Sequence, residues 1–164
     1  PASPTLTVVD DPVSSSDATR ITYRVDVSGP AATSQTFLNV VLATSSGQAA
    51  LPATSLIQAS VGNLVGAQVL DGSTTRISLF STDGLPQNSA TYIATYAGTG
   101  VHVLANLTPN TSLSVLQNGV SIGAVGVSDQ GVGRFLATGG GTFVIGGQAP
   151  GGGPTNPSTV LRIA

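Results

Sequence analysis

The sequence predicts an all-β protein, folded as an antiparallel β-sandwich of about 12 short strands. The main observation is a hydrophobic period of two, in which apolar and polar residues alternate along several short runs. Turn residues separate these runs at intervals of about 8–12 residues, which is typical of sandwiches and barrels. No segment shows a sustained helical period, and Lys, Glu and Met, which favour helices, are absent from the chain.

Three runs in the first quarter of the chain predict strands. Thr5–Val9 carries alternating apolar residues. The run from Ile21 to Val27 also alternates, so this strand should bury one face and expose the other. Phe37–Leu42 is almost continuously apolar, which predicts a strand that is buried on both faces.

Further strands are expected in the body of the chain. In Thr75–Ser81 the alternation places Ile77 and Leu79 on one face and Phe80 on the other. In Ser112–Gln117 apolar residues alternate with serines in the same way. Both patterns predict strands that contribute one face to a hydrophobic core.

Asn118-Gly119 gives the strongest turn signal. It lies between the strand-like runs Ser112–Gln117 and Val120–Val125. A two-residue hairpin turn needs positive φ at both central residues, and Asn and Gly accept this most readily. Weaker signals of the same kind are Asp71-Gly72 and Asp83-Gly84, while Pro109-Asn110 separates the runs Val101–Leu107 and Thr111–Leu116.

The domain prediction is a single sandwich module over residues 1–164. Gly146–Pro157 contains no apolar run and predicts a flexible loop. Ser158–Ile163 then returns to a strand pattern and should pair with the body or with another molecule. A weak internal boundary lies near Gly84–Ser89, but each side has too few strands for a separate fold.

The composition excludes several classes of function. The 12 charged residues are seven Asp and five Arg, with a net charge of -2, so no basic surface for nucleic acid is expected. Apolar runs reach about five residues, far below the ~20 needed for a membrane span. There is no Cys, hence no disulfide or thiol chemistry. Low charge with abundant Ser, Thr and Gly favours a secreted, extracellular protein.

No catalytic, cofactor or metal site is predicted. His102 is the single histidine, and it lies in a strand-like run without the G-x-S-x-G pattern of a nucleophile. One His and no Cys do not make a zinc site. Asp10, Asp11 and Asp17 could supply oxygen ligands to calcium, but they lack the spacing of a calcium loop and fit turn residues before Pro12 better.

The candidate glycan contacts are Tyr92, Tyr96 and His102. The two tyrosines are four residues apart on one predicted strand, so they share a face. Sugar rings stack on such aromatic platforms, and the chain has no Trp to provide another. The alternative is that both rings belong to the core and that His102 is a hydrogen-bonded strand residue.

Four segments together carry a family resemblance that covers roughly residues 19–145. They are TFLNVVLATSSGQAALPATSLI, NLVGAQVLDGSTTRISLFSTDG, YAGTGVHVLANLTPNTSLSVLQNG and SDQGVGRFLATGGGTFVI. In this order they resemble the C-terminal β-sandwich of heparinase II/III-like polysaccharide lyases and of related secreted enzymes. The resemblance implies a sandwich that follows a helical catalytic toroid, and none of that toroid's catalytic residues has a counterpart here.

Two hypotheses of function follow from these observations. The first is a non-catalytic accessory β-sandwich of a secreted polysaccharide-degrading enzyme, which stabilises the catalytic domain and contacts glycan. The alternative is a structural subunit of an extracellular fibre, in which Thr5–Val9 or Ser158–Ile163 is donated to the open sheet edge of a neighbouring subunit. A stand-alone hydrolase is the least favoured interpretation, because no site supports it.

Overall fold

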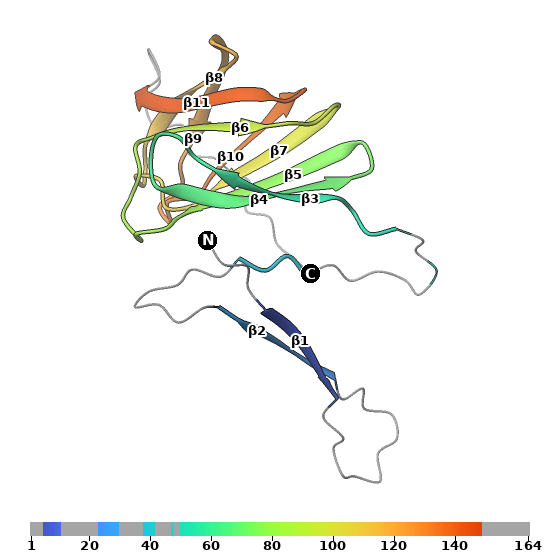
Figure 1. Cartoon of the computed structure of the whole chain (residues 1–164). Helices are drawn as coiled ribbons and strands as arrows, with labels where there is room; N and C mark the ends of the chain where they lie inside the picture. Colours follow the sequence, from blue (N-terminus) through green and yellow to red (C-terminus); the bar gives the residue numbers. More distant parts are fainter. Residues whose placement is uncertain (1–4, 11–22, 30–37, 42–46, 48–49, 149–164) are drawn as a thin grey trace. The chain divides into compact units, whose positions relative to one another are not determined.

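The computed structural model describes residues 5–10, 23–29, 38–41, 47 and 50–148, and every element in that part of the chain is a strand (Figure 1). The all-β prediction is therefore confirmed. The chain divides into two compact units, Pro1–Phe37 and Leu38–Ala164, and each is described by itself. The extent of the predicted single module stays a prediction. Within the described part there is no helix that could cross a membrane.

Unit 1 contains an antiparallel hairpin of β1 (Thr5–Asp10) and β2 (Tyr23–Ser28). The register places Leu6 opposite Val27 and Val8 opposite Val25, so these four residues share one face. The expectation that alternation buries such a face is wrong within unit 1, where Leu6, Val8 and Val25 are 66%, 61% and 56% exposed. Two strands alone provide no second layer to cover it.

Unit 2 is a two-layer sandwich (Figure 1). Its five-stranded sheet has the order β10-β7-β5-β4-β3 and its four-stranded sheet has the order β6-β11-β8-β9. The strands are β3 (Thr54–Gln58), β4 (Leu64–Asp71), β5 (Thr74–Ser81), β6 (Ser89–Ala94), β7 (Thr99–Leu104), β8 (Ser112–Gln117), β9 (Val120–Gly126), β10 (Gly133–Thr138) and β11 (Gly141–Gln148).

The pairing is antiparallel except between β5 and β7, which run parallel. A parallel pair cannot be joined by a tight turn and needs a crossover connection. Here the chain leaves the first sheet after Ser81, forms β6 in the second sheet, and returns at Thr99. The weak boundary expected near Gly84–Ser89 does not divide the chain, because both of its sides belong to unit 2; the segment there is the passage from β5 to β6.

The alternating patterns in unit 2 predict the inward residues correctly. Ile77 and Leu79 on β5 are buried, as are Leu113 and Val115 on β8, while Phe80 lies half-buried on the other face of β5. These side chains join one core between the two sheets. Its members are Ile57, Leu64, Ile77, Leu79, Ala90, Tyr92, Ala94, Tyr96, Leu104, Leu107, Leu113, Val115, Val125, Val127, Ala137, Phe143 and Ile145.

The predicted buried strand at Phe37–Leu42 is wrong for its four described residues. Leu38–Val41 belongs to no strand, and Val41 is 88% exposed. A strand buried on both faces needs a place inside a sheet, and those places are filled by β4, β5 and β7. Phe37 and Leu42 lie outside the described residues.

The Asn118-Gly119 hairpin is confirmed. Both residues have positive φ, 52° and 80°, and Gln117 pairs with Val120 on either side of them. The turn between β4 and β5 is shifted by one residue from the prediction. Asp71 pairs with Thr74, so Gly72 (φ 61°) and Ser73 are the central residues. A positive φ at the first central position is the signature of the type II′ turn.

Asp83-Gly84 is not a hairpin turn, because the next strand lies in the other sheet. Asp83 instead organises the passage: its carboxylate accepts hydrogen bonds from the Ser81 hydroxyl, the Leu85 N–H and the Asn63 amide. The Ser81 hydroxyl is the main cause that holds the pKa of Asp83 below its usual range.

Two seams bring the sheets together at their edges. Val61, just after β3, bridges to Thr91 on β6, and Val127, just after β9, bridges to Gly133 on β10. The sandwich is thus partly closed at both sides, which shortens the open edges.

At the C-terminal side, β11 continues to Gln148. The first three residues of the predicted Gly146–Pro157 loop therefore belong to a strand. The rest of that loop and the predicted strand Ser158–Ile163 lie outside the described residues.

Candidate functional site

The three candidate glycan contacts meet in the centre of the sandwich. Tyr92 lies on β6, Tyr96 follows β6, and His102 lies on β7 in the opposite sheet. His102 is 0% exposed, and Tyr92 and Tyr96 are buried as well. Both tyrosines were expected on one strand, but β6 ends at Ala94. The alternation of buried and exposed residues continues past it to Tyr96, so all three side chains point inward.

Two phenylalanines complete the aromatic cluster. The ring of Phe135 on β10 stacks on that of His102, with centroids 4.5 Å apart and planes at 13°. Phe143 on β11 lies 4.4 Å from the same imidazole, at 52°. Each sheet thus contributes rings to one packed cluster in the core.

Both imidazole nitrogens of His102 are occupied by tyrosine hydroxyls. The Tyr92 hydroxyl lies 2.7 Å from Nδ1, and the Tyr96 hydroxyl lies 2.7 Å from Nε2. A neutral imidazole donates from one nitrogen and accepts at the other, so one tyrosine accepts from His102 and the other donates to it. The polar atoms of the cluster are therefore satisfied by one another.

Burial keeps all three groups neutral. It lowers the pKa of His102 to about 4, because the charged imidazolium would lose its water. It raises the pKa of Tyr96 to about 12, and that of Tyr92 is also raised, again mainly by burial. Within the physiological range the cluster carries no charge.

The glycan platform is accordingly not what these residues form. A stacking platform must present a ring face to solvent, whereas these rings face one another in the core. Gly100 allows the ring of Tyr96 to pack closely against the backbone of β7, since a Cβ at this position would collide with that ring. The core alternative considered from the sequence is the one that the geometry supports. The same burial leaves His102 no free nitrogen with which to act as a general base.

The acidic residues considered for calcium are only partly described. Asp10 ends β1, while Asp11 and Asp17 lie outside the described residues. Among the residues that are described, no three His, Cys, Asp or Glu side chains come together as a metal site would need. The calcium hypothesis therefore gains no support from geometry.

Two exposed apolar features stand out among the described residues. The first is the hairpin face of unit 1, formed by Leu6, Val8, Val25 and Val27. A hairpin of two strands is at best marginally stable in water, so such a face favours contact with another surface.

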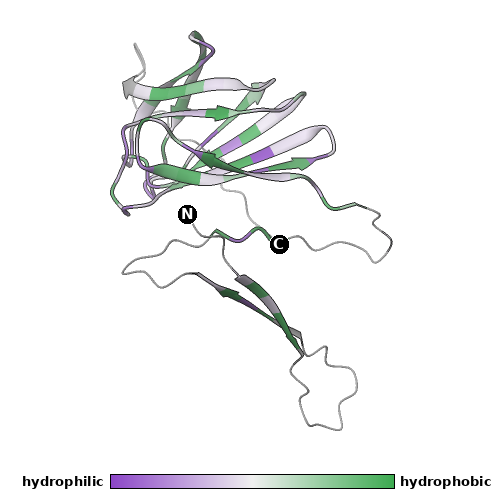
Figure 2. Cartoon of the chain, in the orientation of Figure 1, coloured by the Kyte–Doolittle hydropathy of each residue, from purple (hydrophilic) through white to green (hydrophobic). Residues whose placement is uncertain are grey.

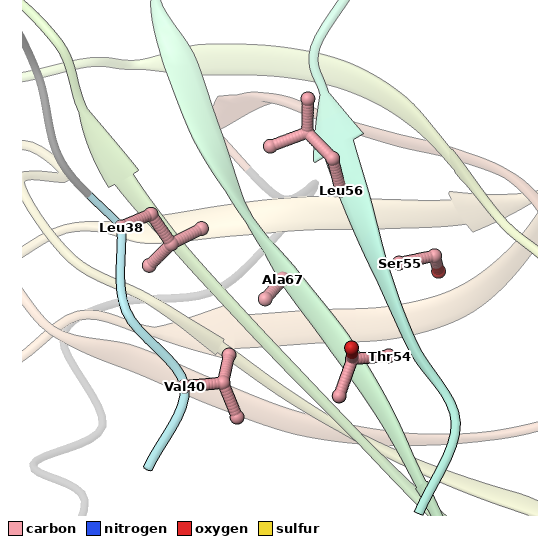
Figure 3. A pocket seen from close by; sticks show the side chains of 6 residues that line it. All are labelled: Leu38, Val40, Thr54, Ser55, Leu56 and Ala67. Atoms are coloured by element: carbon pink, nitrogen blue, oxygen red, sulfur yellow. The ribbon is translucent and has the colours of Figure 1, made fainter. Parts of the chain in front are cut away.

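The second feature is a shallow pocket of about 320 Å³ on unit 2 (Figure 3). Ala67 on β4 lies between two walls, one made by Leu38 and Val40 and the other by β3, including Leu56. Leu56 is 68% exposed. Its strand, β3, is an edge strand of the five-stranded sheet and is hydrogen-bonded there to β4. The sequence gives little sign of this pocket, because its walls come from segments that only the fold brings together.

Sequence reasoning also missed a polar link between the sheets. The amide of Gln68 on β4 donates to the Thr95 carbonyl at 2.8 Å and accepts from the Thr95 N–H at 3.1 Å. The available sequence signal was weak: Gln68 is the one polar side chain within the apolar run Leu64–Leu70, and a buried polar group needs a hydrogen-bond partner.

Comparison with protein-family models and with curated proteins gave no match.

Proposed function

We propose that this chain is a non-catalytic accessory β-sandwich of a secreted polysaccharide-degrading enzyme, and that it docks on the catalytic domain through the hairpin of unit 1. The observation that carries the proposal is the apolar hairpin face, in which Leu6, Val8 and Val25 are each more than half exposed. Such a face is stabilised by packing on a protein surface.

The chemistry of unit 2 supports a structural role. Its single histidine is held between two tyrosines in the core, so it serves packing rather than proton transfer. The resemblance of residues 19–145 to lyase sandwich domains supplies the class of enzyme. Contact with glycan remains part of the proposal, but Tyr92, Tyr96 and His102 are no longer its candidates, because they are buried.

The docking face is tested by dye binding to the isolated chain. We expect an apolar-surface dye such as ANS to bind, and the triple variant Leu6→Ser, Val8→Ser, Val25→Ser to bind much less. The matched control changes the polar face of the same hairpin, Thr5→Ser and Thr7→Ser, and should keep the dye signal. If the isolated chain binds no dye, the apolar hairpin face is not accessible and the docking proposal is contradicted.

Absence of catalysis is tested separately. The purified chain should not turn over heparin, chondroitin or alginate. Turnover that is lost in His102→Ala, while the variant stays folded, would contradict the proposal.

The second candidate is a fibre subunit that is assembled by strand donation. The observation that favours it is the edge of the sheet at β3. This strand has five residues, none of them charged, and it lies next to the pocket over Ala67. Backbone groups on an open edge pair readily with an added strand, and pockets beside it accept alternate side chains.

Size exclusion and electron microscopy separate the two candidates. The accessory module should remain a small soluble species with or without residues 1–11. Long regular filaments from the intact chain, lost on removal of residues 1–11 or of residues 158–164, would instead establish the fibre subunit.

A further inference from the structure

The tip of the β8–β9 hairpin is fastened to the start of β11. The Asn118 N–H donates to the Thr142 carbonyl at 2.8 Å, and the Thr142 N–H donates to the Asn118 side-chain Oδ1 at 2.9 Å. Gly141 lies against the same side chain, so closely that a Cβ at that position would collide with it. The side chain of Asn118 thus has one fixed orientation.

Gln117 holds the neighbouring loop. Its Nε2 lies within hydrogen-bond distance of three successive carbonyls, those of Thr138, Gly139 and Gly140, at 3.0, 2.9 and 3.2 Å. We call Gln117, Asn118 and the segment Thr138–Thr142 the turn clasp. Through side-chain hydrogen bonds it joins the β8–β9 hairpin turn to the connection between β10 and β11, which crosses from one sheet to the other.

Asn-Gly is also the dipeptide in which an asparagine side chain most easily loses its amide. The Gly119 nitrogen attacks Cγ of Asn118, a new N–Cγ bond forms, the Cγ–Nδ2 bond breaks, and ammonia leaves with the proton of the Gly119 amide. Water then opens the resulting succinimide at either carbonyl, which gives aspartate or isoaspartate. Glycine allows the reaction because it has no side chain to hinder the attack.

We propose that Asn118 is a deamidation site that the turn clasp keeps closed, so that it reacts only when the β8–β9 turn opens. Ring closure requires Cγ of Asn118 to turn toward the Gly119 nitrogen. In the closed clasp the carboxamide is held on the Thr142 N–H, with Gly141 packed against it. Local opening of a surface turn requires far less free energy than global unfolding, so it sets the rate.

The reaction changes the clasp once it has occurred. Isoaspartate adds a methylene to the main chain and removes the side-chain carbonyl that Thr142 binds. Both products also bring a negative charge to the four-stranded sheet, whose strands contain no charged residue. Modified molecules are therefore expected to have a weaker β8–β9 turn.

The test measures loss of the Asn118 amide by mass spectrometry of the full chain, kept folded or unfolded in urea at the same mildly alkaline pH. We expect the folded chain to react at least about tenfold more slowly than the unfolded chain, in proportion to the rarity of the open state. Equal rates in the two states would overturn the proposal.

Two variants identify the gate. Gln117→Leu should raise the folded rate several-fold and leave the unfolded rate unchanged, while the exposed-strand control Gln58→Leu changes neither. Ile77→Val lowers global stability at a distance, and its folded rate should stay that of the parent chain. An unchanged rate in Gln117→Leu, or an increase in Ile77→Val equal to that in Gln117→Leu, would show that the clasp is not the gate.

Discussion

At the scale of single residues, the stability of the fold depends on how a few polar side chains are buried. His102 is accommodated in an apolar core because each of its nitrogens meets a tyrosine hydroxyl at 2.7 Å. A buried polar group without a partner would destabilise the fold by about 1–3 kcal/mol. Within the described residues no buried side-chain nitrogen or oxygen lacks a hydrogen bond. The cluster is therefore compatible with a stable core, provided that it stays neutral.

The first prediction at this scale concerns pH. The pKa of His102 falls from 6.5 to about 4 on folding, mainly because of burial. Below pH 6.5 the unfolded chain takes up a proton that the folded chain does not, so stability is fully present above this pH and is lost as the pH falls toward 4. The loss should reach about 3 kcal/mol at most, from about 1.4 kcal/mol per pKa unit.

Urea unfolding at a series of pH values measures this loss. The control is the triple variant Tyr92→Phe, Tyr96→Phe, His102→Leu, which removes the titrating group together with its partners and should be flat in the same window. Asp83 does not interfere, because its pKa lies below 3.8 and its contribution is lost only at lower pH. A parent chain that is equally stable at both ends of the window would contradict a buried neutral His102.

The second prediction concerns the tyrosine hydroxyls. Tyr92→Phe or Tyr96→Phe leaves one nitrogen of His102 without its partner, so each should lower the free energy of unfolding by about 1–3 kcal/mol. The triple variant should lose less than the sum of its single changes, because no polar group is then left unpaired. Additive losses in thermal or urea unfolding would show that the three groups are not coupled.

At the scale of elements, turn geometry determines where strands begin and end. The β8–β9 hairpin has two residues of positive φ, and one of these is Gly119 at 80°. The β4–β5 hairpin uses Gly72 at 61°. Charged side chains do little to determine how the strands pair, because few strongly hydrophilic residues lie along them (Figure 2). Register therefore depends on these turns and on the inward alternation of apolar residues.

The third prediction is made for the β8–β9 turn. Gly119→Val should lower the free energy of unfolding by more than about 1 kcal/mol, because a β-branched residue resists positive φ. No atom lies near enough to Gly119 to crowd an added Cβ, so the effect comes from the backbone alone. The conservative strand change Ser121→Thr is the control, and an unchanged melting temperature in Gly119→Val would place the turn elsewhere.

At the scale of the whole molecule, unit 2 is held together by contacts between its two sheets. The aromatic cluster fills the centre, two bridges close the sides, and Gln68 ties β4 to the backbone at Thr95. Unit 1 presents the opposite case, a hairpin with an apolar face that its own residues do not cover. This contrast underlies the proposal that the hairpin docks on another protein surface.

The fourth prediction belongs to the link between the sheets. Gln68→Leu removes both hydrogen bonds to Thr95 and should lower the free energy of unfolding by about 1–2 kcal/mol. Thr95 is exposed, so water replaces part of the loss and limits the effect. Gln58→Leu, an exposed change on β3, should stay within about 0.5 kcal/mol of the parent. Equal stability of the two variants would show that the Gln68 link is not important.

The sequence by itself determined the fold class, most of the strands and the best turn. These follow from local rules, because side chains alternate along a strand and because Asn and Gly accept positive φ. Ile77, Leu79, Leu113 and Val115 could be assigned to the core on this basis alone. The prediction for Leu38–Val41 failed, since an apolar run does not reveal whether a sheet has room for it.

Only the tertiary structure decided what Tyr92, Tyr96 and His102 do. Alternation places the tyrosines on one face, but it does not say whether that face meets solvent or another sheet. The answer depends on β7 and β10 in the opposite layer, since β7 brings His102 against the tyrosines and β10 brings Phe135 against His102. Three other features were likewise decided only by the tertiary structure: the parallel β5–β7 pair, the pocket over Ala67 and the turn clasp. Each joins segments far apart in the chain, and such contacts leave no periodic signal in the sequence.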